Sequence, residues 1–230
     1  MCGRFTQIYS WAEVHEQYNL ILPDPIPNLE PRYNVAPTQR IDIVVPEEGG
    51  RALARARWGL VPFFWKKSLK EAARLSTFNA KSEEAASKPF FRAAMKARRC
   101  IVPASGFYEW RTEEGQKQPY YITAAGGEIL SFAGLWETWK DPDTEERLVS
   151  ATIMTTAANA TMQELHHRMP VIVKADQVDG WLVDGDQELL APCDPQMIEF
   201  RRVSKRVNNV RNQGHDLLDA SEQAEPEKRP

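Results

Sequence analysis

Short β-type runs joined by tight turns dominate the middle of the chain, and this feature most constrains the fold. The turns, such as Gly126-Gly127, leave no regular crossover helices between the strands. Strands connected in this way pair mostly antiparallel, so we predict an α+β fold with a largely antiparallel, barrel-like β-sheet and flanking helices. The runs are residues 99–110, 119–125, 129–136, 147–156 and 170–174, and a hairpin is predicted about Gly126-Gly127.

The remaining segments add a second hairpin and several helices. Residues 40–60 form two β-type runs about a turn at 47–50, which predicts a hairpin. Residues 23–38 contain five prolines and are expected to form an extended loop. Helices are predicted at 11–22, 83–98, 158–166 and 178–183, and a last strand at 196–203.

Length and charge indicate one folded domain followed by an acidic tail. The 230 residues are 42% hydrophobic and 10% aromatic, which is enough for a sizeable core. The net charge is −3, but residues 215–230 hold five acidic residues against one lysine and one arginine. The rest of the chain is neutral, so any DNA-binding face must be a local patch. We predict a single domain at 1–214 and a disordered tail at 215–230.

Several classes of protein are disfavoured by what the sequence lacks. It has no run of eighteen apolar residues and no secretory signal, so we expect a cytoplasmic protein without a membrane partner. The three cysteines, Cys2, Cys100 and Cys193, are widely spaced and form no C-x-x-C pair, so neither a disulfide framework nor a zinc site is predicted. No phosphate-cradling glycine motif is present, and no cofactor is expected.

Cys2 is the residue with the most distinctive chemistry. Removal of Met1 makes it the N-terminus, where a thiol and an α-amine stand on adjacent carbons. The amine condenses with an aldehyde to an imine, and the thiol then closes on the same carbon to form a thiazolidine. A free α-amine titrates near ~8 and a free thiol near ~8.5, so both are readily activated near neutral pH. For an arbitrary chain, a cysteine at this position is more often an accident of the gene start.

Seven short strings of polar and aromatic residues accompany Cys2. They are 2–5 (CGRF), 32–39 (RYNVAPTQ), 58–62 (WGLVP), 78–83 (FNAKSE), 105–110 (SGFYEW), 165–170 (LHHRMP) and 207–212 (VNNVRN). Together and in this order they resemble the SRAP family, the SOS-response-associated peptidases. The resemblance runs from Cys2 to about Gly214. It implies the SRAP fold, a role in DNA damage, and covalent trapping of abasic sites in single-stranded DNA through Cys2.

The resemblance assigns catalytic roles to residues that look ordinary on their own. Glu109 reads locally as a strand glutamate facing solvent, and the resemblance makes it the proton shuttle. Asn79 reads as a turn residue, and the resemblance places its amide beside the sugar or the Cys2 amine. His166 and His167 are adjacent, and the family pattern His-x-Arg selects His166, which would help open the sugar and stabilise or reverse the crosslink. The two histidines lack metal-ligand spacing.

The resemblance also suggests the DNA contacts. Positively charged side chains beside the reactive residues would contact phosphates, and Lys81 stands where many family members have arginine. Phe64 and Trp65 would stack on bases, although core packing explains aromatic residues equally well. Asn34 and Thr155 would line the pocket, or else serve a turn and a strand. The predicted DNA-binding set is Arg4, Asn34, Phe64, Trp65, Lys81, Thr155 and Arg168, with a basic cluster at Lys66, Lys67, Lys70 and Arg74 that extends the groove or coats a helix.

The leading hypothesis is therefore a monomer that crosslinks itself to abasic single-stranded DNA, without metal or cofactor, and that joins the nucleoid when bound. The first alternative is a thiol N-terminal-nucleophile peptidase or autopeptidase, in which the Cys2 thiolate attacks a peptide carbonyl with His166 as base. The family name carries that peptidase assignment. A second alternative is a module that binds single strands without forming a bond.

Overall fold

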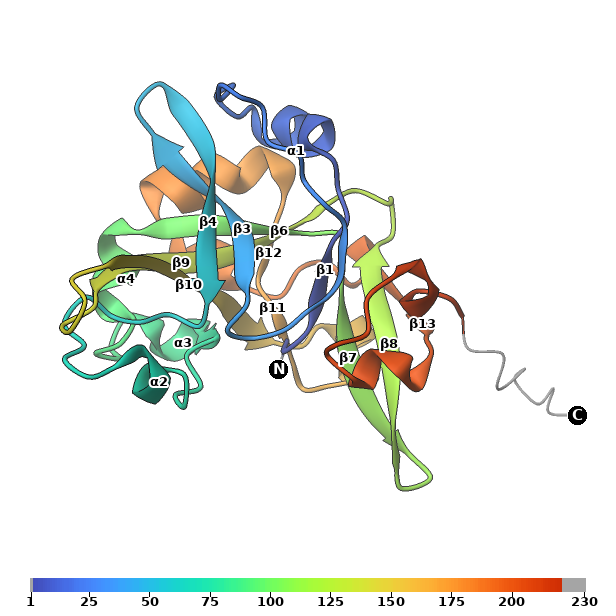
Figure 1. The fold of residues 1–230 in the computed structure, drawn as a ribbon. Helices are drawn as coiled ribbons and strands as arrows, with labels where there is room; N and C mark the ends of the chain where they lie inside the picture. The colour runs from blue at the N-terminus through green and yellow to red at the C-terminus, as the bar shows by residue number, and fades with distance from the viewer. Residues whose placement is uncertain (1, 221–230) are drawn as a thin grey trace, which may run out of the picture.

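A closed ring of five strands forms the centre of the fold, and the computed structural model describes residues 2–220 of the chain (Figure 1). The ring consists of β3 (Arg40–Glu47), β4 (Gly50–Trp58), β6 (Arg99–Ala104), β9 (Leu130–Lys140) and β10 (Arg147–Ala157). The strands pair in the order β10-β4-β3-β6-β9, and β9 pairs back with β10. Only the β4–β10 pair in this ring is parallel. The predicted α+β fold with a largely antiparallel, barrel-like sheet is confirmed.

A second sheet of five strands lies beside the barrel (Figure 1). Its order is β13-β8-β7-β1-β2, and every pair is antiparallel. The strands are β1 (Phe5–Gln7), β2 (Arg32–Val35), β7 (Gly106–Glu113), β8 (Gln116–Ala124) and β13 (Ile198–Arg202). Three short strands extend the barrel sheet: β5 (Asn79–Lys81) and β11 (Arg168–Pro170) pair with β10, and β12 (Ile172–Val173) pairs with β9.

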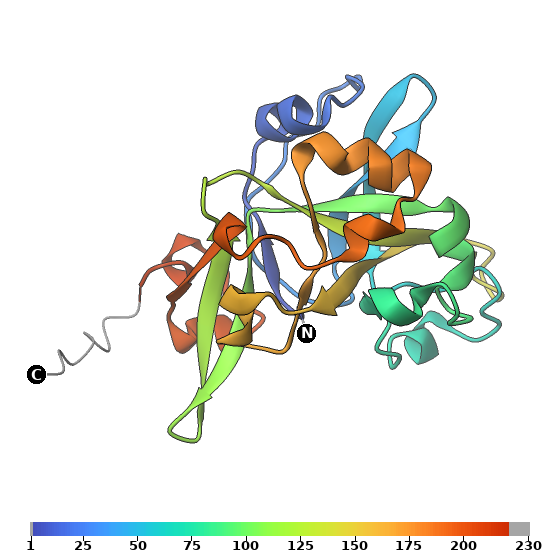
Figure 2. The ribbon, with the colours of Figure 1, turned by 180° about the vertical axis from the view of Figure 1, so that it is seen from behind.

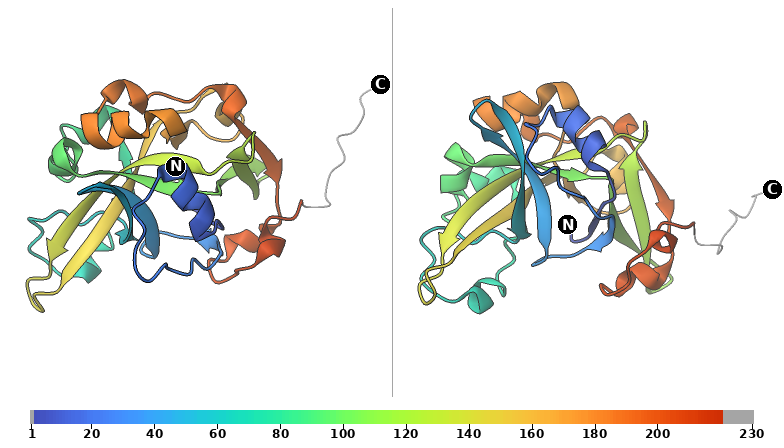
Figure 3. Two further views of the ribbon diagram at one scale, coloured as in Figure 1. Left: turned by 90° about the horizontal axis from the view of Figure 1, so that it is seen from above. Right: turned by 45° about the horizontal axis from the view of Figure 1, so that its top comes forward.

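Short helices surround the two sheets (Figures 2 and 3). The α-helices are α1 (Trp11–Tyr18), α2 (Leu69–Ala72), α3 (Ser82–Ala85), α4 (Arg92–Ala97) and α5 (Ala160–Gln163). A π-helical turn occurs at Gly180–Asp184. Short 3₁₀-helices occur at Ala175–Gln177, Gln187–Leu190, Pro195–Met197, Lys205–Asn208 and His215–Leu217. α1 begins with a reciprocal Ser10–Glu13 cap and ends where Asn19 adopts a left-handed conformation, so it is shorter than predicted. No helix within residues 2–220 is long and apolar enough to cross a membrane.

The main hydrophobic core fills the barrel and the space between the barrel and the second sheet. Phe5 stands at the junction, with its ring 5.0 Å from Trp58 and 6.3 Å from Phe132. Phe107 on β7 continues the cluster at 5.7 Å from Phe132. Cys2 belongs to the same cluster and is fully buried. Cys2 is therefore held in place by the hydrophobic core.

The structure corrects the predicted hairpin about Gly126-Gly127. β8 pairs with β7 and β13, whereas β9 pairs with β6, β10 and β12, so the two strands belong to different sheets. The hairpin that does form joins β7 to β8 through Glu114 and Gly115, with φ angles of 49° and 76°. Two consecutive left-handed residues make the tight turn that matches strand twist. Residues 125–129 instead carry the chain from one sheet to the other.

Two further segments differ from their sequence-based assignment. The helix predicted at 83–98 is two short helices, α3 and α4, separated by residues 86–91. The proline-rich segment predicted as a loop contains β2, which pairs with β1 through Phe5↔Val35. The helix expected at 158–166 is present as the shorter α5.

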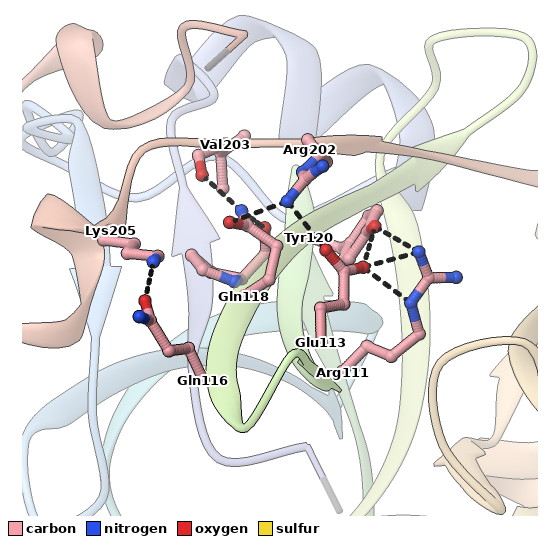
Figure 4. A network of polar contacts seen from close by, with 9 residues as sticks. Arg111, Glu113, Gln116, Gln118, Tyr120, Arg202, Val203 and Lys205 are labelled. Carbon is pink, nitrogen blue, oxygen red and sulfur yellow. Dashed lines mark hydrogen bonds and ion pairs between the residues drawn. The ribbon is translucent and has the colours of Figure 1, made fainter. Parts of the chain in front are cut away.

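The β7–β8 hairpin is tied to the following segment by a polar network (Figure 4). Glu113 accepts hydrogen bonds from Arg111 at 2.7 Å, from the Tyr120 hydroxyl at 2.5 Å and from Arg202 at 2.7 Å. Gln118 donates to the carbonyl of Val203 at 3.0 Å. Lys205 donates to Gln116 at 2.6 Å. These bonds hold residues 198–205 against the hairpin and so position the segment that follows.

The folded part of the chain extends beyond residue 214. Leu217 and Leu218 are buried, and Ala220 forms a bridge with Val203. The boundary predicted at residue 214 therefore falls before the end of the packed chain, which continues to Ala220. The rest of the predicted acidic tail, residues 221–230, lies outside the described residues, as does Met1.

Candidate functional site

The register between β1 and β7 brings the start of the chain to Glu109. Phe5 pairs with Phe107, and the Tyr108 N–H donates to the Arg4 carbonyl at 2.9 Å. Two residues further, the chain at Cys2 runs alongside Glu109. Burial, followed by the negative charge of Glu109, raises the pKa of the Cys2 thiol to about 12. With Met1 attached, the thiol is therefore protonated at neutral pH.

Asn79 fixes the backbone of Cys2 from the barrel side. It lies on β5, which pairs with β10 through Ile153↔Asn79. Its Nδ2 donates to the Cys2 carbonyl at 2.7 Å. Its Oδ1 is buried and accepts no hydrogen bond within residues 2–220. A buried acceptor without a donor costs about 1–3 kcal/mol, so this amide is incompletely satisfied in the unliganded protein.

Glu109 is a buried carboxylate, 6% exposed, on the part of β7 nearest the amino terminus. The Trp110 N–H donates to its Oε1 at 3.2 Å. Its negative charge acts on the Cys2 thiol and also on the His166 imidazole. Glu109 therefore interacts electrostatically with both groups. It is not the solvent-facing strand glutamate that its local sequence suggests.

His166 lies between α5 and β11 and has a fixed orientation. Its Nδ1 lies 2.9 Å from the Arg168 backbone nitrogen and 3.2 Å from the Arg168 carbonyl oxygen, so the backbone of Arg168 orients the ring. Burial lowers the pKa of His166, and the charge of Glu109 opposes that shift. His167 is exposed and stacks on His166, with ring centroids 4.2 Å apart. Of the two adjacent histidines, His166 is the one held beside the carboxylate.

Half-buried Arg4 and buried Asn34 together contact the 207–212 segment near the start of the chain. The Arg4 guanidinium donates to Asn34 Oδ1 at 2.6 Å and to the Val207 carbonyl at 2.8 Å. Asn34 Nδ2 donates to the carbonyls of Val207, Asn209 and Asn212, at 3.0–3.2 Å. Asn34 is fully buried, so its contacts hold the 207–212 segment in place. Arg4 stays half-buried, with its guanidinium 5.6 Å from the Trp110 ring centroid.

Lys81, Thr155 and Arg168 come together where β5 and β11 flank the end of β10. Arg168 makes a two-pronged ion pair with Glu83, at 2.6 and 2.9 Å, and also donates to the Thr155 carbonyl at 2.7 Å. Thr155 is fully buried beneath it. Lys81 is exposed, and its ammonium lies 3.7 Å from Glu84. Both cations thus have carboxylate neighbours in the unliganded protein.

Phe64 and Trp65 behave differently from each other. Phe64 is 39% exposed, and its ring contacts Phe63, which is 58% exposed. Trp65 is partly buried against Trp139, whose indole N–H donates to the Trp65 carbonyl at 2.8 Å. The surface aromatic pair is therefore Phe63 and Phe64, while Trp65 anchors the loop that carries them.

The sequence did not reveal several neighbours of the predicted site residues. Trp110 donates through its indole N–H to Asn208 at 2.7 Å, next to Arg4. Glu83 holds Arg168. These partners are separated by about a hundred residues or by a strand crossover, so no local spacing pattern identifies them. Within residues 2–220, no group of three acidic, histidine or cysteine side chains could hold a metal ion.

The fold therefore buries Cys2 against the Asn79 amide, and the charge of Glu109 acts on both Cys2 and His166. The chain belongs to the SRAP family, because the family model described as SOS response associated peptidase (SRAP) matches residues 1–210.

Relatives and solved structures agree with that membership. "Abasic site processing protein YoqW" of Bacillus subtilis (strain 168) is 37% identical over 227 residues, which cover 96% of this chain and all of that protein. "Abasic site processing protein HMCES" of Xenopus tropicalis is 31% identical, covering 83% of this chain and 66% of that protein. A crystal structure of a protein from Bacteroides thetaiotaomicron has a TM-score of 0.80 at 27% identity, covering 89% and 93% of the two chains.

Proposed function

We propose that this protein processes abasic sites in damaged DNA by forming a covalent thiazolidine crosslink through Cys2 after Met1 has been removed. The similarity to proteins named for abasic site processing supports the substrate. The observation that carries the chemistry is the buried Cys2 with Asn79 bonded to its carbonyl and Glu109 acting on its thiol. An abasic site supplies an aldehyde when its sugar opens, and a 1,2-aminothiol is the group that traps an aldehyde in a ring.

The reaction divides into steps that the site residues can serve. In the closed sugar, proton transfer from O1 to O4′ opens the ring and exposes the C1′ aldehyde. The His166 imidazole supplies an N–H donor for O4′. The Cys2 amine attacks C1′, and loss of water leaves an imine. Glu109 carries the protons that leave the amine and return to the departing oxygen.

Ring closure completes the crosslink. The Cys2 sulfur adds to the imine carbon, the imine nitrogen gains the thiol proton, and a C–S bond closes the five-membered ring. The product is a thiazolidine rather than a strand break, because the thiol captures the imine before β-elimination. The unsatisfied Asn79 Oδ1 can accept a hydrogen bond from a hydroxyl of the sugar or from the Cys2 amine.

Removal of Met1 makes the Cys2 nitrogen a nucleophile. While Met1 is attached, the Cys2 nitrogen is an amide and is not nucleophilic, and the thiol pKa of about 12 keeps the sulfur protonated. Removal frees the amine, which in its neutral form attacks the aldehyde carbon, while the thiol keeps the proton that it later gives to the imine nitrogen. The retained-Met1 protein should therefore be inert for crosslinking.

The experiment mixes purified protein with single-stranded DNA that holds one abasic site, and looks for a heat-stable shifted band. Mass spectrometry of the digested adduct should locate the sugar on Cys2, with the mass of a ring-closed product. Cys2→Ala should bind without a heat-stable band. If protein with a verified Cys2 terminus forms no band, the crosslinking function is refuted.

The alternative function is a peptidase or autopeptidase in which the Cys2 thiolate attacks a peptide carbonyl. It requires sulfur chemistry alone, so acetylation of the α-amine separates the two functions. Acetylated protein should lose DNA crosslinking, whereas the nucleophile of a thiol peptidase would persist. We also propose that the protein acts on DNA in the cytoplasm as a monomer.

A further inference from the structure

A small pocket next to the reaction centre has no role in the proposed chemistry. It has a volume of about 150 Å³ and lies between the end of β4, the turn before β3 and the segment that follows α2. Its lining includes Thr38, Arg57, Gly59, Arg74 and Ser76. None of the residues that line it is acidic. A pocket with two arginines and no carboxylate has the composition of an anion site.

Arg57 is the unusual member of this pocket. It is 7% exposed, and one of its Nη1 hydrogens is donated to the Gly59 carbonyl at 2.8 Å. Within residues 2–220 its other N–H groups make no hydrogen bond, and no carboxylate forms an ion pair with it. These other N–H groups are not among the fully buried polar atoms that lack a partner, so they face the open space of the pocket. Arg57 therefore retains donors that a ligand in the pocket can accept from.

The backbone of the pocket is shaped around this side chain. Gly59 adopts a φ of 121°, and a Cβ at that position would lie 2.9 Å from Arg57 Nη1. Glycine thus allows the guanidinium to fold back over the end of its own strand. Arg74 and Ser76 are exposed at the pocket rim, and within the described part of the chain neither side chain is engaged in a hydrogen bond or ion pair. Their donors add to those of Arg57.

Trp58 contacts both the pocket and the hydrophobic cluster that contains Cys2. Trp58 and Phe78 both line the pocket, and the Trp58 indole N–H donates to the Phe78 carbonyl at 2.8 Å. On its other side, Trp58 packs against Phe5 in the cluster that contains Cys2. Phe78 directly precedes Asn79, which is bonded to Cys2. A strand whose abasic sugar reaches Cys2 would thus carry a neighbouring phosphate past this pocket.

We propose that Arg57, with Arg74, binds one backbone phosphate of the DNA strand that contains the abasic site. The inference rests on the proposed function, since that function brings the strand to the pocket. The buried guanidinium offers paired N–H donors to two phosphate oxygens, and Arg74 adds charge from the rim. This contact holds the strand in register and carries no information about base sequence.

The test is a double-mutant cycle between the protein and the DNA backbone. Single-stranded oligonucleotides with one abasic site are prepared with one neutral methylphosphonate at each position around the lesion. Their affinities are measured with protein carrying Cys2→Ala, so that binding is reversible, and with the same protein also carrying Arg57→Met. At one position, the methylphosphonate should weaken binding about tenfold to the first protein and leave binding to the second unchanged.

A second variant guards against loss of folding. Arg74→Met changes an exposed side chain, so its thermal unfolding should match the parent protein. It should reduce the slope of log affinity against log salt by about 0.7, as loss of one single-strand phosphate contact does. Arg147→Met removes the same charge from an exposed position at the start of β10, and its slope should not change.

The possible results separate this inference from the proposed function. If every methylphosphonate effect is additive with Arg57→Met in folded protein, and Arg74→Met keeps the parent slope, the phosphate site is refuted. Thermal stabilisation by inorganic phosphate that depends on Arg57, without coupling to any DNA phosphate, would assign the pocket to a free anion and refute the DNA contact. Protein with native Cys2 is tested for crosslinking in parallel. Absence of crosslinking there refutes the proposed function itself.

Discussion

Asn79→Ala is expected to reduce crosslinking because Asn79 fixes the backbone of the reacting residue. The substitution removes the 2.7 Å bond from Nδ2 to the Cys2 carbonyl and leaves that carbonyl in a buried environment. Loss of a buried partner costs about 1–3 kcal/mol. Removal of the unsatisfied Oδ1 offsets part of this cost. We therefore expect a loss of about 1–2 kcal/mol in the free energy of unfolding.

The effect on the reaction should exceed the effect on stability. Without Asn79, the Cys2 backbone is no longer held at one position, and its amine samples geometries that do not reach the sugar. Misplacement of a reacting group by about 1 Å can cost about a hundredfold in rate. We expect the crosslinking rate at saturating DNA to fall roughly 10–100-fold. Single-turnover gels with abasic single-stranded DNA measure this rate, and thermal unfolding measures stability.

Gln118→Ala provides the matched control. Gln118 is a buried amide that donates to the Val203 carbonyl at 3.0 Å, outside the reaction centre (Figure 4). It should lose comparable stability and keep its crosslinking rate. If Asn79→Ala and Gln118→Ala slow crosslinking equally, or if Asn79→Ala leaves the rate unchanged, the positioning argument is wrong.

Three further changes test other parts of the site. Glu109→Gln should slow crosslinking about 10²–10⁴-fold while leaving affinity for abasic DNA in a Cys2→Ala background nearly unchanged, as gel shift and single-turnover rates together would reveal. Because burial lowers the pKa of His166 below its usual 6.5, the neutral ring should persist under mildly acidic conditions; the rate should fall only as pH drops through that lowered value, and His166→Gln should remove this limb of the pH–rate profile. Because of the same shift, the folded protein binds fewer protons than the unfolded chain. The free energy of unfolding should therefore decrease as pH falls from about 6.5 through the lowered pKa of His166, and urea midpoints measured across that window would show this decrease. Gly59→Ala should destabilise the protein by about 1–3 kcal/mol, since φ is 121° and the new Cβ would lie 2.9 Å from Arg57; an unchanged melting temperature would contradict that strain.

Local patterns were sufficient where a contact lies within one hairpin. The β3–β4 hairpin was predicted from alternation about its turn, and it pairs from Arg40↔Arg57 to Glu47↔Gly50. The predicted hairpin at Gly126-Gly127 was wrong, because the strands on either side of this turn pair with strands of two different sheets. A glycine pair permits a reversal, but cross-strand partners decide whether the two strands pair. The left-handed conformations at Glu114 and Gly115 closed a different hairpin.

The candidate site was predicted through the family resemblance rather than through spacing. Cys2, Asn79, Glu109 and His166 lie far apart in the chain, and each looks ordinary in its own window. Their neighbourhood arises because β1 pairs with β7 and because β5 pairs with β10. The role of Glu83 as the partner of Arg168, and the burial of Asn34 beneath the 207–212 segment, were not accessible before these pairings were known.

The sequence by itself determined which chemical groups this protein contains and which elements of secondary structure predominate. The 1,2-aminothiol at Cys2, the family strings and the predominance of strands are all readable in one dimension, because covalent chemistry and hydrophobic periodicity are local properties. Tertiary structure alone decided the electrostatic environment of those groups. Burial raises the pKa of the Cys2 thiol, and the backbone of Arg168 orients the His166 ring. The open donors of Arg57 are identified only when its surroundings are known. Desolvation and hydrogen bonding depend on every neighbour in space, and strand pairing brings those neighbours from distant parts of the chain.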